Sequence, residues 1–236
     1  MALARVQGTG RVFATSTTSV ALTFAAPPTV GNGIVVLVSL FQAIGPMTTT
    51  CADNRGNTYA SAATRNTAGV QISSTIHYCS LVGTTGTPFT VTLTITSGTG
   101  VYFEAAAVEV SGVGTGLLLD QTATNAGSGT AISTGTTAGL TGTEVLLVAA
   151  HAVAANQSTI TVATVTPAWT QECENLSYSA TIASEGDTRV LTSAAGTTQA
   201  ATWTDAPGGN FTAVLAAFKA GASGGGSVSR SVAYVG

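Results

Sequence analysis

Two acidic residues flank a cysteine shortly after a tryptophan, in the segment Trp169-Thr-Gln-Glu-Cys-Glu174. A glycoside hydrolase needs two carboxyl groups about 5–10 Å apart near the sugar. Residues two apart on a β-strand share a face, so Glu172 and Glu174 have a permissible spacing. Such pairs are common on solvated edge strands, and catalysis also requires a perturbed pKa. The pair alone is insufficient evidence of catalysis, so we expect no enzyme and keep glycan degradation as an alternative.

The two histidines, His77 and His151, are far apart, and neither accompanies a Gly-x-Ser-x-Gly elbow. His77 lies two residues before Cys79, but the third group that orients a catalytic pair is not identifiable. Cys51, Cys79 and Cys173 show neither a disulfide framework nor zinc spacing, so we expect free, mostly buried thiols. The sequence therefore predicts no catalytic residue, no cofactor and no metal site.

Two further segments have a possible binding role. Asp53-Asn-Arg-Gly-Asn57 lacks the ligand spacing and distal glutamate of a calcium loop, so it predicts an Asx-rich turn. Trp169 and Trp203 could form a sugar-stacking platform, although a lone tryptophan in a β-sandwich more often belongs to the core. A carbohydrate-binding, lectin-like module is therefore the alternative function.

The composition is poor in charge. Only 7% of the 236 residues are charged, against roughly 25% in ordinary globular chains. Seven Lys and Arg, of which Lys219 is the one lysine, exclude nucleic-acid binding by phosphate neutralisation. Helical bundles need charged solvent faces and are disfavoured.

The start of the chain does not have the pattern of a signal peptide, and the apolar run Val145–Ala155 is too short to span a bilayer. We therefore expect no membrane contact, and a chain that either stays in the cell that makes it or leaves by a route that needs no signal, of which host lysis is one.

Alternation of apolar and polar residues is the dominant pattern. Phe89–Thr96, Val70–Val82 and the segment containing Val20, Leu22 and Phe24 predict half-buried strands. Other runs are apolar on both faces, which predicts central strands covered on both sides or strands that meet a partner; these are Ile34–Leu40, Val101–Val110, Val145–Val153 and Phe211–Phe218. Gly, Pro, Asn and Asp clusters separate the strands. The expected fold is all-β, an antiparallel β-sandwich or jelly roll.

A weak internal repeat relates two halves, residues 27–113 and 140–220. Gly33-Ile-Val-Val-Leu-Val38 resembles Glu144-Val-Leu-Leu-Val148, 111 positions later, and Tyr102-Phe-Glu-Ala resembles Asn210-Phe-Thr-Ala, 108 positions later. The halves could be two domains, two sheets of one sandwich, or two sandwiches that share a core. We expect one β-sandwich domain over residues 1–220 and a Gly-rich C-terminal arm over residues 221–236.

The arm predicts contact between subunits. A flexible Gly/Ser linker precedes the short apolar segment Val228–Val235. Such a segment can add a strand to the sheet edge of a neighbour. A surface with so little charge is typical of a chain that meets copies of itself, so we expect a symmetric homo-oligomer, a trimer. The expected contact residues are Val228, Val232, Tyr234 and Val235 of the arm, with Phe211 and Phe218 of the body.

Five segments carry a family resemblance: residues 27–38, 52–59, 74–78, 108–113 and 213–218. The chain resembles, over roughly residues 3–220, Gly/Thr/Ala-rich jelly-roll (lectin-like) accessory virion proteins of tailed bacteriophages. The resemblance implies a non-enzymatic head decoration or minor tail protein on the exterior of the virion, without catalytic residues to carry over. It would stabilise the particle or contact the host surface, with other virion proteins and a host glycan as partners.

Overall fold

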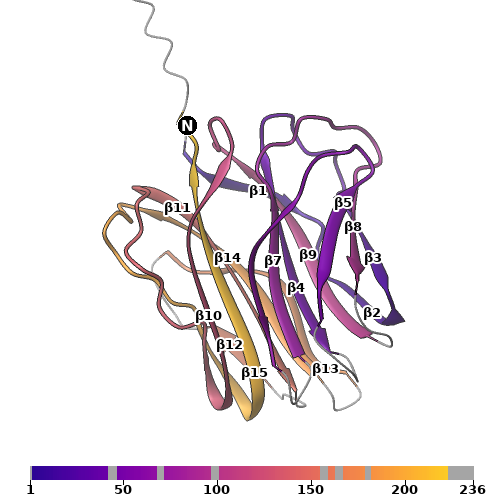
Figure 1. The fold of residues 1–236 in the computed structure, drawn as a ribbon, viewed down its shortest axis with the longest axis vertical. Coiled ribbons are helices and arrows are strands. Elements are labelled where there is room, and N and C mark those ends of the chain that lie inside the picture. The colour runs from indigo at the N-terminus through magenta and orange to yellow at the C-terminus, as the bar shows by residue number, and fades with distance from the viewer. Residues whose placement is uncertain are drawn as a thin grey trace, which may run out of the picture.

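The computed structural model describes residues 2–41, 47–67, 72–96, 101–154, 159–162, 167–178 and 182–222. Every regular element in these ranges is a β-strand, and the strands pair antiparallel. Within them there is no helix whose length and apolarity would let it cross a membrane. The predicted all-β, antiparallel sandwich class is confirmed (Figure 1).

The N-terminal half forms two sheets. The N-terminal sheet has the order β1-β9-β4-β7-β6, with β2 also paired to β9. A small three-stranded sheet, β3-β8-β5, packs against it. The strands of the N-terminal sheet are β1 (Ala4–Gly8), β2 (Val12–Thr17), β4 (Gly33–Phe41), β6 (Ala60–Asn66), β7 (Ile72–Cys79) and β9 (Val101–Ser111). Those of the small sheet are β3 (Ser19–Thr23), β5 (Thr49–Asp53) and β8 (Thr90–Ile95).

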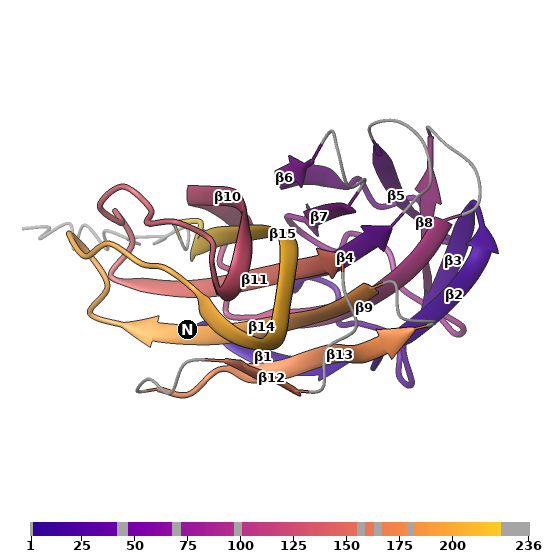
Figure 2. The ribbon, with the colours of Figure 1, turned by 90° about the horizontal axis from the view of Figure 1, so that it is seen from below.

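The C-terminal half forms one sheet that curls. Its order is β10-β15-β11-β14-β13, with β12 paired to the start of β15. The two long strands β10 and β15 bend over, so that one sheet supplies both layers of this half (Figure 2). The strands are β10 (Leu117–Ser133), β11 (Glu144–Ala154), β12 (Thr159–Val162), β13 (Thr170–Tyr178), β14 (Ile182–Thr192) and β15 (Thr202–Ala220).

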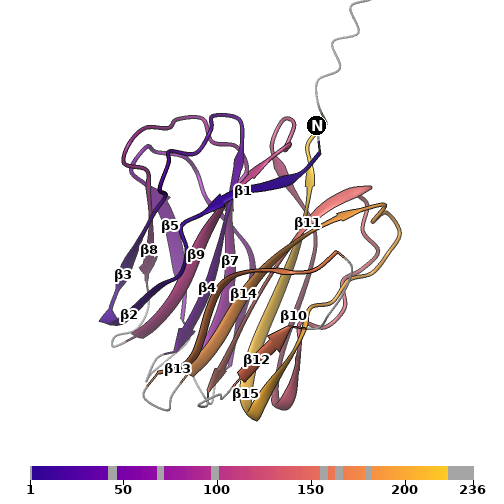
Figure 3. The ribbon, with the colours of Figure 1, turned by 180° about the vertical axis from the view of Figure 1, so that it is seen from behind.

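The two halves share one topology. The path β9-β4-β7-β6 corresponds strand by strand to β15-β11-β14-β13, and the small sheet corresponds to the end of β10, the start of β15 and β12. The halves are therefore two sandwiches placed back to back. From behind, β14 and β13 lie across β4 and β9 (Figure 3).

Three apolar clusters fill the spaces between the layers. The N-terminal sheet packs on the small sheet around Leu22, Leu93 and Phe103. The curled sheet encloses its own core around Leu147 and Trp203. The third cluster lies between the two main sheets and combines Leu37 and Val108 from the N-terminal half with Leu146, Val214 and Phe218 from the C-terminal half. This shared core makes the central strands buried on both faces.

The strand predictions can now be compared with the burial of individual side chains. In β3 and β8, Val20, Leu22, Val91 and Leu93 are buried and alternate with exposed or half-buried residues, as the alternation predicts. The prediction of a half-buried strand over Val70–Val82 was wrong for β7 within its described residues, because one face, which includes His77, is covered by the small sheet and the other, which includes Ser74, is covered by the C-terminal sheet. The residues at 70 and 71 lie outside the described ranges. Alternation of apolar and polar residues is typical of a strand with one covered face, whereas both faces of β7 are covered.

Candidate functional site

Most of the carboxyl groups of this acid-poor chain are inside the molecule. Of its ten Asp and Glu residues, six are buried: Glu104, Glu109, Glu172, Glu185, Asp187 and Asp205. A buried carboxyl group costs free energy unless it is paired or hydrogen-bonded. How each group is satisfied therefore separates structural carboxyls from candidates for a further role.

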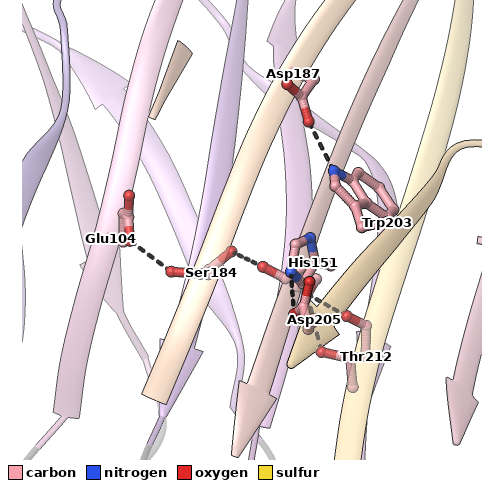
Figure 4. Close-up of polar contacts among 9 residues, drawn as sticks. Glu104, His151, Ser184, Asp187, Trp203, Asp205 and Thr212 are labelled. Carbon is pink, nitrogen blue, oxygen red and sulfur yellow. Dashed lines mark hydrogen bonds and ion pairs between the residues drawn. The ribbon is translucent and has the colours of Figure 1, made fainter. Parts of the chain in front are cut away.

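The side chains of His151, Glu185, Asp187 and Asp205 line the core of the C-terminal half. Figure 4 shows His151, Asp187 and Asp205 together with Trp203. His151 Nε2 of β11 and Asp205 Oδ2 of β15 are 3.1 Å apart, and both side chains are fully buried. The His151 ring lies 4.6 Å from the ring of Trp203, centroid to centroid. Trp203 Nε1 donates a hydrogen bond of 2.9 Å to Asp187 Oδ2 of β14. We call His151, Glu185, Asp187, Asp205 and Trp203 the buried acidic cluster.

The carboxyls of the buried acidic cluster are under-satisfied. Glu185 lies opposite His151 in the β11–β14 register, and Asp187 lies two residues further on, on the same face of β14. Burial and the neighbouring Glu185 raise the pKa of Asp187 to about 9, and burial raises that of Glu185. One polar atom on each of His151, Glu185, Asp187 and Asp205 finds no hydrogen-bond partner among the described residues. Ordinary buried polar groups are paired, so this cluster is exceptional.

A second polar group ties the two halves together. Arg5 of β1 makes a bidentate ion pair with Glu172 of β13, with Nε–Oε1 at 2.7 Å and Nη2–Oε2 at 2.8 Å. Thr188 Oγ1 donates a hydrogen bond of 2.6 Å to Glu172 Oε1. Nearby, Ser184 Oγ donates to Glu104 of β9 across the interface between the sheets (Figure 4). These contacts fix the relative position of the two sandwiches.

The internal duplication shows that the buried acidic cluster is confined to one half. The pair Leu40–Ser73 in β4 and β7 occupies the register of His151–Glu185 in β11 and β14. In the same register Thr75 corresponds to Asp187. The strand β8, which is the counterpart of the start of β15, presents Val91, Leu93 and Ile95 to its core instead of Asp205 and Trp203. The same fold is therefore built without these ionisable groups in the N-terminal half.

The cluster has no arrangement that supports chemistry on a substrate. Within the described part of the chain, no group of three or more His, Cys, Asp or Glu side chains is placed to hold a metal ion. His151, Asp187 and Asp205 are fully buried, so no substrate reaches them in this conformation. Buried carboxyl groups can still gain or lose protons, at a pKa that burial raises.

The residue pairs suggested by the sequence do not come together as sites. Glu172 is bound to Arg5 and Thr188, while Glu174 is half-buried, and a bulge between Gln171 and Cys173 separates their environments. His77 accepts or donates a 2.7 Å hydrogen bond with Thr49, and burial lowers its pKa to about 4. The three cysteines are free, two of them buried, as predicted.

The predicted turn and the tryptophans are now placed. Asp53 accepts hydrogen bonds from the backbone of Arg55 and Asn57 and from Tyr59, which makes the segment the predicted Asx-rich turn. Trp203 is only 2% exposed. Trp169 is half-buried against the C-terminal core, and the Arg189 guanidinium lies 5.8 Å from its ring centroid. The two rings therefore do not form a shared platform for a sugar.

The expected contact residues of the body lie in cores of the same chain. Phe211 packs in the C-terminal core, and Phe218 packs in the shared core against Tyr78, with ring centroids 5.0 Å apart. Their strand is covered on both faces within one chain, so neither side chain is open to another subunit. Val228, Val232, Tyr234 and Val235 lie outside the described residues.

The surface offers one long sheet edge and one apolar end. In the described ranges β10 pairs only with β15, and Asp120 is the one charged residue among its seventeen. Near its start Leu118 is 44% exposed, while Leu81 and Val30 are 42% and 56% exposed. Backbone hydrogen bonds from Leu117 to Ser80 and from Gly31 to Val82 bring these three segments to one end. An open hollow of about 390 Å³, lined by residues 29–32 and 111–114, lies at this end.

We compared the chain with protein-family models, with curated proteins and with solved structures, and none of them matches it.

Proposed function

We propose that this chain is a non-enzymatic structural protein that assembles with copies of itself through the free edge of β10. On the family resemblance, we place that assembly on the exterior of a tailed-phage virion, as a head decoration or minor tail protein. There it would stabilise the particle or contact the host, alongside other virion proteins.

The observation that carries the assembly proposal is the long outer edge of β10. Proteins that stay apart protect long edge strands with lysine, proline, bulges or covering loops. The strand β10 has two bulges, between Leu119 and Gln121 and between Gly129 and Ala131. Its seventeen residues contain neither lysine nor proline, and most of its side chains are small and exposed or half-buried. The other end strands of the two main sheets, β1, β6 and β13, are shorter and each carries Arg or Glu. A partner strand on β10 would satisfy its outward N–H and C=O groups.

The test is the mass of the native species in solution. We expect the full chain to be an oligomer, a trimer, and the double variant Thr122→Lys, Thr124→Lys to fall to monomer because charge on the edge blocks strand addition. Both threonines are exposed on β10. Thr92→Lys is the matched control, since Thr92 is exposed on β8, the central strand of the small sheet. A full chain that stays monomeric at high concentration would overturn the proposal.

A truncation separates the arm from the edge. Ending the chain after Ala222 keeps Gly221, whose N–H binds the carbonyl groups of Val113 and Gly116. If the truncated chain dissociates as the lysine variant does, the arm is the segment that adds to β10. If only the lysine variant dissociates, β10 pairs with the body of another copy. Purified phage particles probed for the chain then test the virion location.

The alternative of a sugar-binding module has less support from the geometry. It depends on exposed aromatic rings, and Trp203 is buried while Trp169 is half-buried beneath Arg189. No further observation favours it, so it is not proposed as a second function.

A further inference from the structure

Two carboxyl groups lie next to each other in the core of the C-terminal half. Glu185 and Asp187 are two residues apart on the same face of β14, and each is 1% exposed or less. Asp187 Oδ2 accepts from Trp203, whereas Glu185 Oε2 and Asp187 Oδ1 have no hydrogen-bond partner among the described residues. Two neighbouring carboxyl groups that are buried together do not both ionise readily, so the pair retains a proton.

Ionisable groups from three other strands surround the pair. His151 of β11 lies opposite Glu185, and its ring is paired with Asp205 of β15. On β13, Glu174 acts on Glu185 and Glu172 on Asp187, and both disfavour a further negative charge. Gln171 hydrogen-bonds Glu185. On β14 itself, the Arg189 guanidinium lies over the ring of Trp169. The strand β12 contributes no ionisable residue.

We propose that Asp187 and Glu185 form a proton-dependent lock: a proton on this buried pair keeps the C-terminal core closed, and its loss at alkaline pH opens the packing around Trp203. Loss of the proton places two neighbouring negative charges in a low-dielectric core. The backbone around the lock can respond by letting water reach the pair. Trp203, which donates to Asp187, is the apolar side chain nearest to that change.

Two observations support the lock. The raised pKa of Asp187, about 9, places proton loss above neutral pH. The equivalent positions in the N-terminal half hold Ser73 and Thr75, which are buried but not ionisable. The fold therefore does not need carboxyl groups at these two positions. The lock acts within one chain and does not depend on the proposed assembly.

Trp203 provides the readout. The chain has two tryptophans, so Trp169→Phe leaves Trp203 as the sole source of tryptophan fluorescence. Between about pH 7 and 10 we expect its emission to shift to the red and its quenching by acrylamide to rise, with a midpoint near 9. Asp187→Asn in the same background keeps an oxygen for the Trp203 bond without the charge, and should remove the transition. Glu104→Gln, also buried but on β9, should keep it.

A second measurement uses the unaltered chain. The side-chain carboxyl ¹³C signal of Asp187 should titrate near pH 9 and not near the ordinary value of 3.8. An Asp187 signal that titrates near 3.8 overturns the lock, and so does an unchanged fluorescence transition in Asp187→Asn. If the asparagine variant does not fold, the carboxyl titration alone decides.

Discussion

At the scale of single residues, the buried carboxyls differ in how completely they are hydrogen-bonded. Glu109 accepts hydrogen bonds from Gln7, from the backbone of Thr29 and from Asn32, so it organises a loop. Glu104 has one hydroxyl donor, Ser184, and a distant guanidinium, with Arg11 Nε 3.6 Å from its Oε1. Burying an ionised carboxylate costs free energy unless it is closely paired and its oxygens are hydrogen-bonded. Glu104 is therefore a carboxyl whose charge destabilises the folded chain.

The sparse hydrogen bonding of Glu104 predicts how the stability of the folded chain depends on pH. Burial raises the pKa of Glu104 from 4.5 to about 7, so between these values the folded state binds more protons than the unfolded state. Its stabilising contribution is complete below 4.5 and is lost as the pH rises to 7, at up to about 1.4 kcal/mol per pH unit. Glu104→Gln should lose this decline, measured as the free energy of unfolding in urea at several pH values.

Subtracting the pH profile of the Glu104→Gln variant from that of the original chain isolates the contribution of Glu104. The lowered pKa of His77, about 4, acts in the opposite direction, since the unfolded state binds the extra proton between 4 and the ordinary 6.5. This contribution is common to both chains and cancels. Glu144→Gln, at the half-buried start of β11, is the control. Parallel pH profiles for the original chain and Glu104→Gln would contradict the assignment.

At the scale of elements, β14 determines how closely the two main sheets approach. A Cβ atom on Gly186 would lie 2.9 Å from Cys173 Sγ and 3.0 Å from Leu37 Cδ2. Gly186→Ala should therefore destabilise the chain by about 1–3 kcal/mol, the usual cost of overpacking a core. The measurement is the midpoint of denaturant unfolding. Gly83→Ala is the control, because its Cβ would meet only Asn57 Oδ1 at 3.8 Å; equal losses in both variants would contradict the packing argument.

A comparison of β14 with β3 and β8 shows what the sequence could and could not predict. Alternation in β3 and β8 predicts their buried faces correctly because one face of each meets water. In β14 the alternation of Glu185, Asp187 and Arg189 is typical of a solvent-facing strand, yet the first two face a core. Burial of polar residues depends on the curl of β10 and β15, which no local pattern specifies. One signal was available, since His151 interrupts an apolar run that must face a core.

At the scale of the whole molecule, the two sandwiches are separate in topology but joined in their packing. The shared core takes Val35, Leu37 and Ile76 from one half and Leu146, Val148 and Phe218 from the other, all fully buried. Arg5 and Glu172 add an ion pair across the same interface. An isolated half would expose this entire face to water, at about 25 cal/mol for each Å² of apolar surface. We therefore expect the two halves to fold as one unit.

This arrangement predicts that neither half folds alone. The chains 1–113 and 114–222 should each give poorly dispersed amide NMR spectra and bind a hydrophobic dye, because removing the partner half strips the covered face from β4, β9, β11 and β15. Mixed at equimolar amounts, the two should recover the dispersed spectrum of the full chain, since the cut lies between Val113 and Gly114, in the connection that precedes β10. The full chain should unfold in one transition by circular dichroism and by tryptophan fluorescence. A well-dispersed spectrum from either half alone would show that the shared core is an interface between two independent domains.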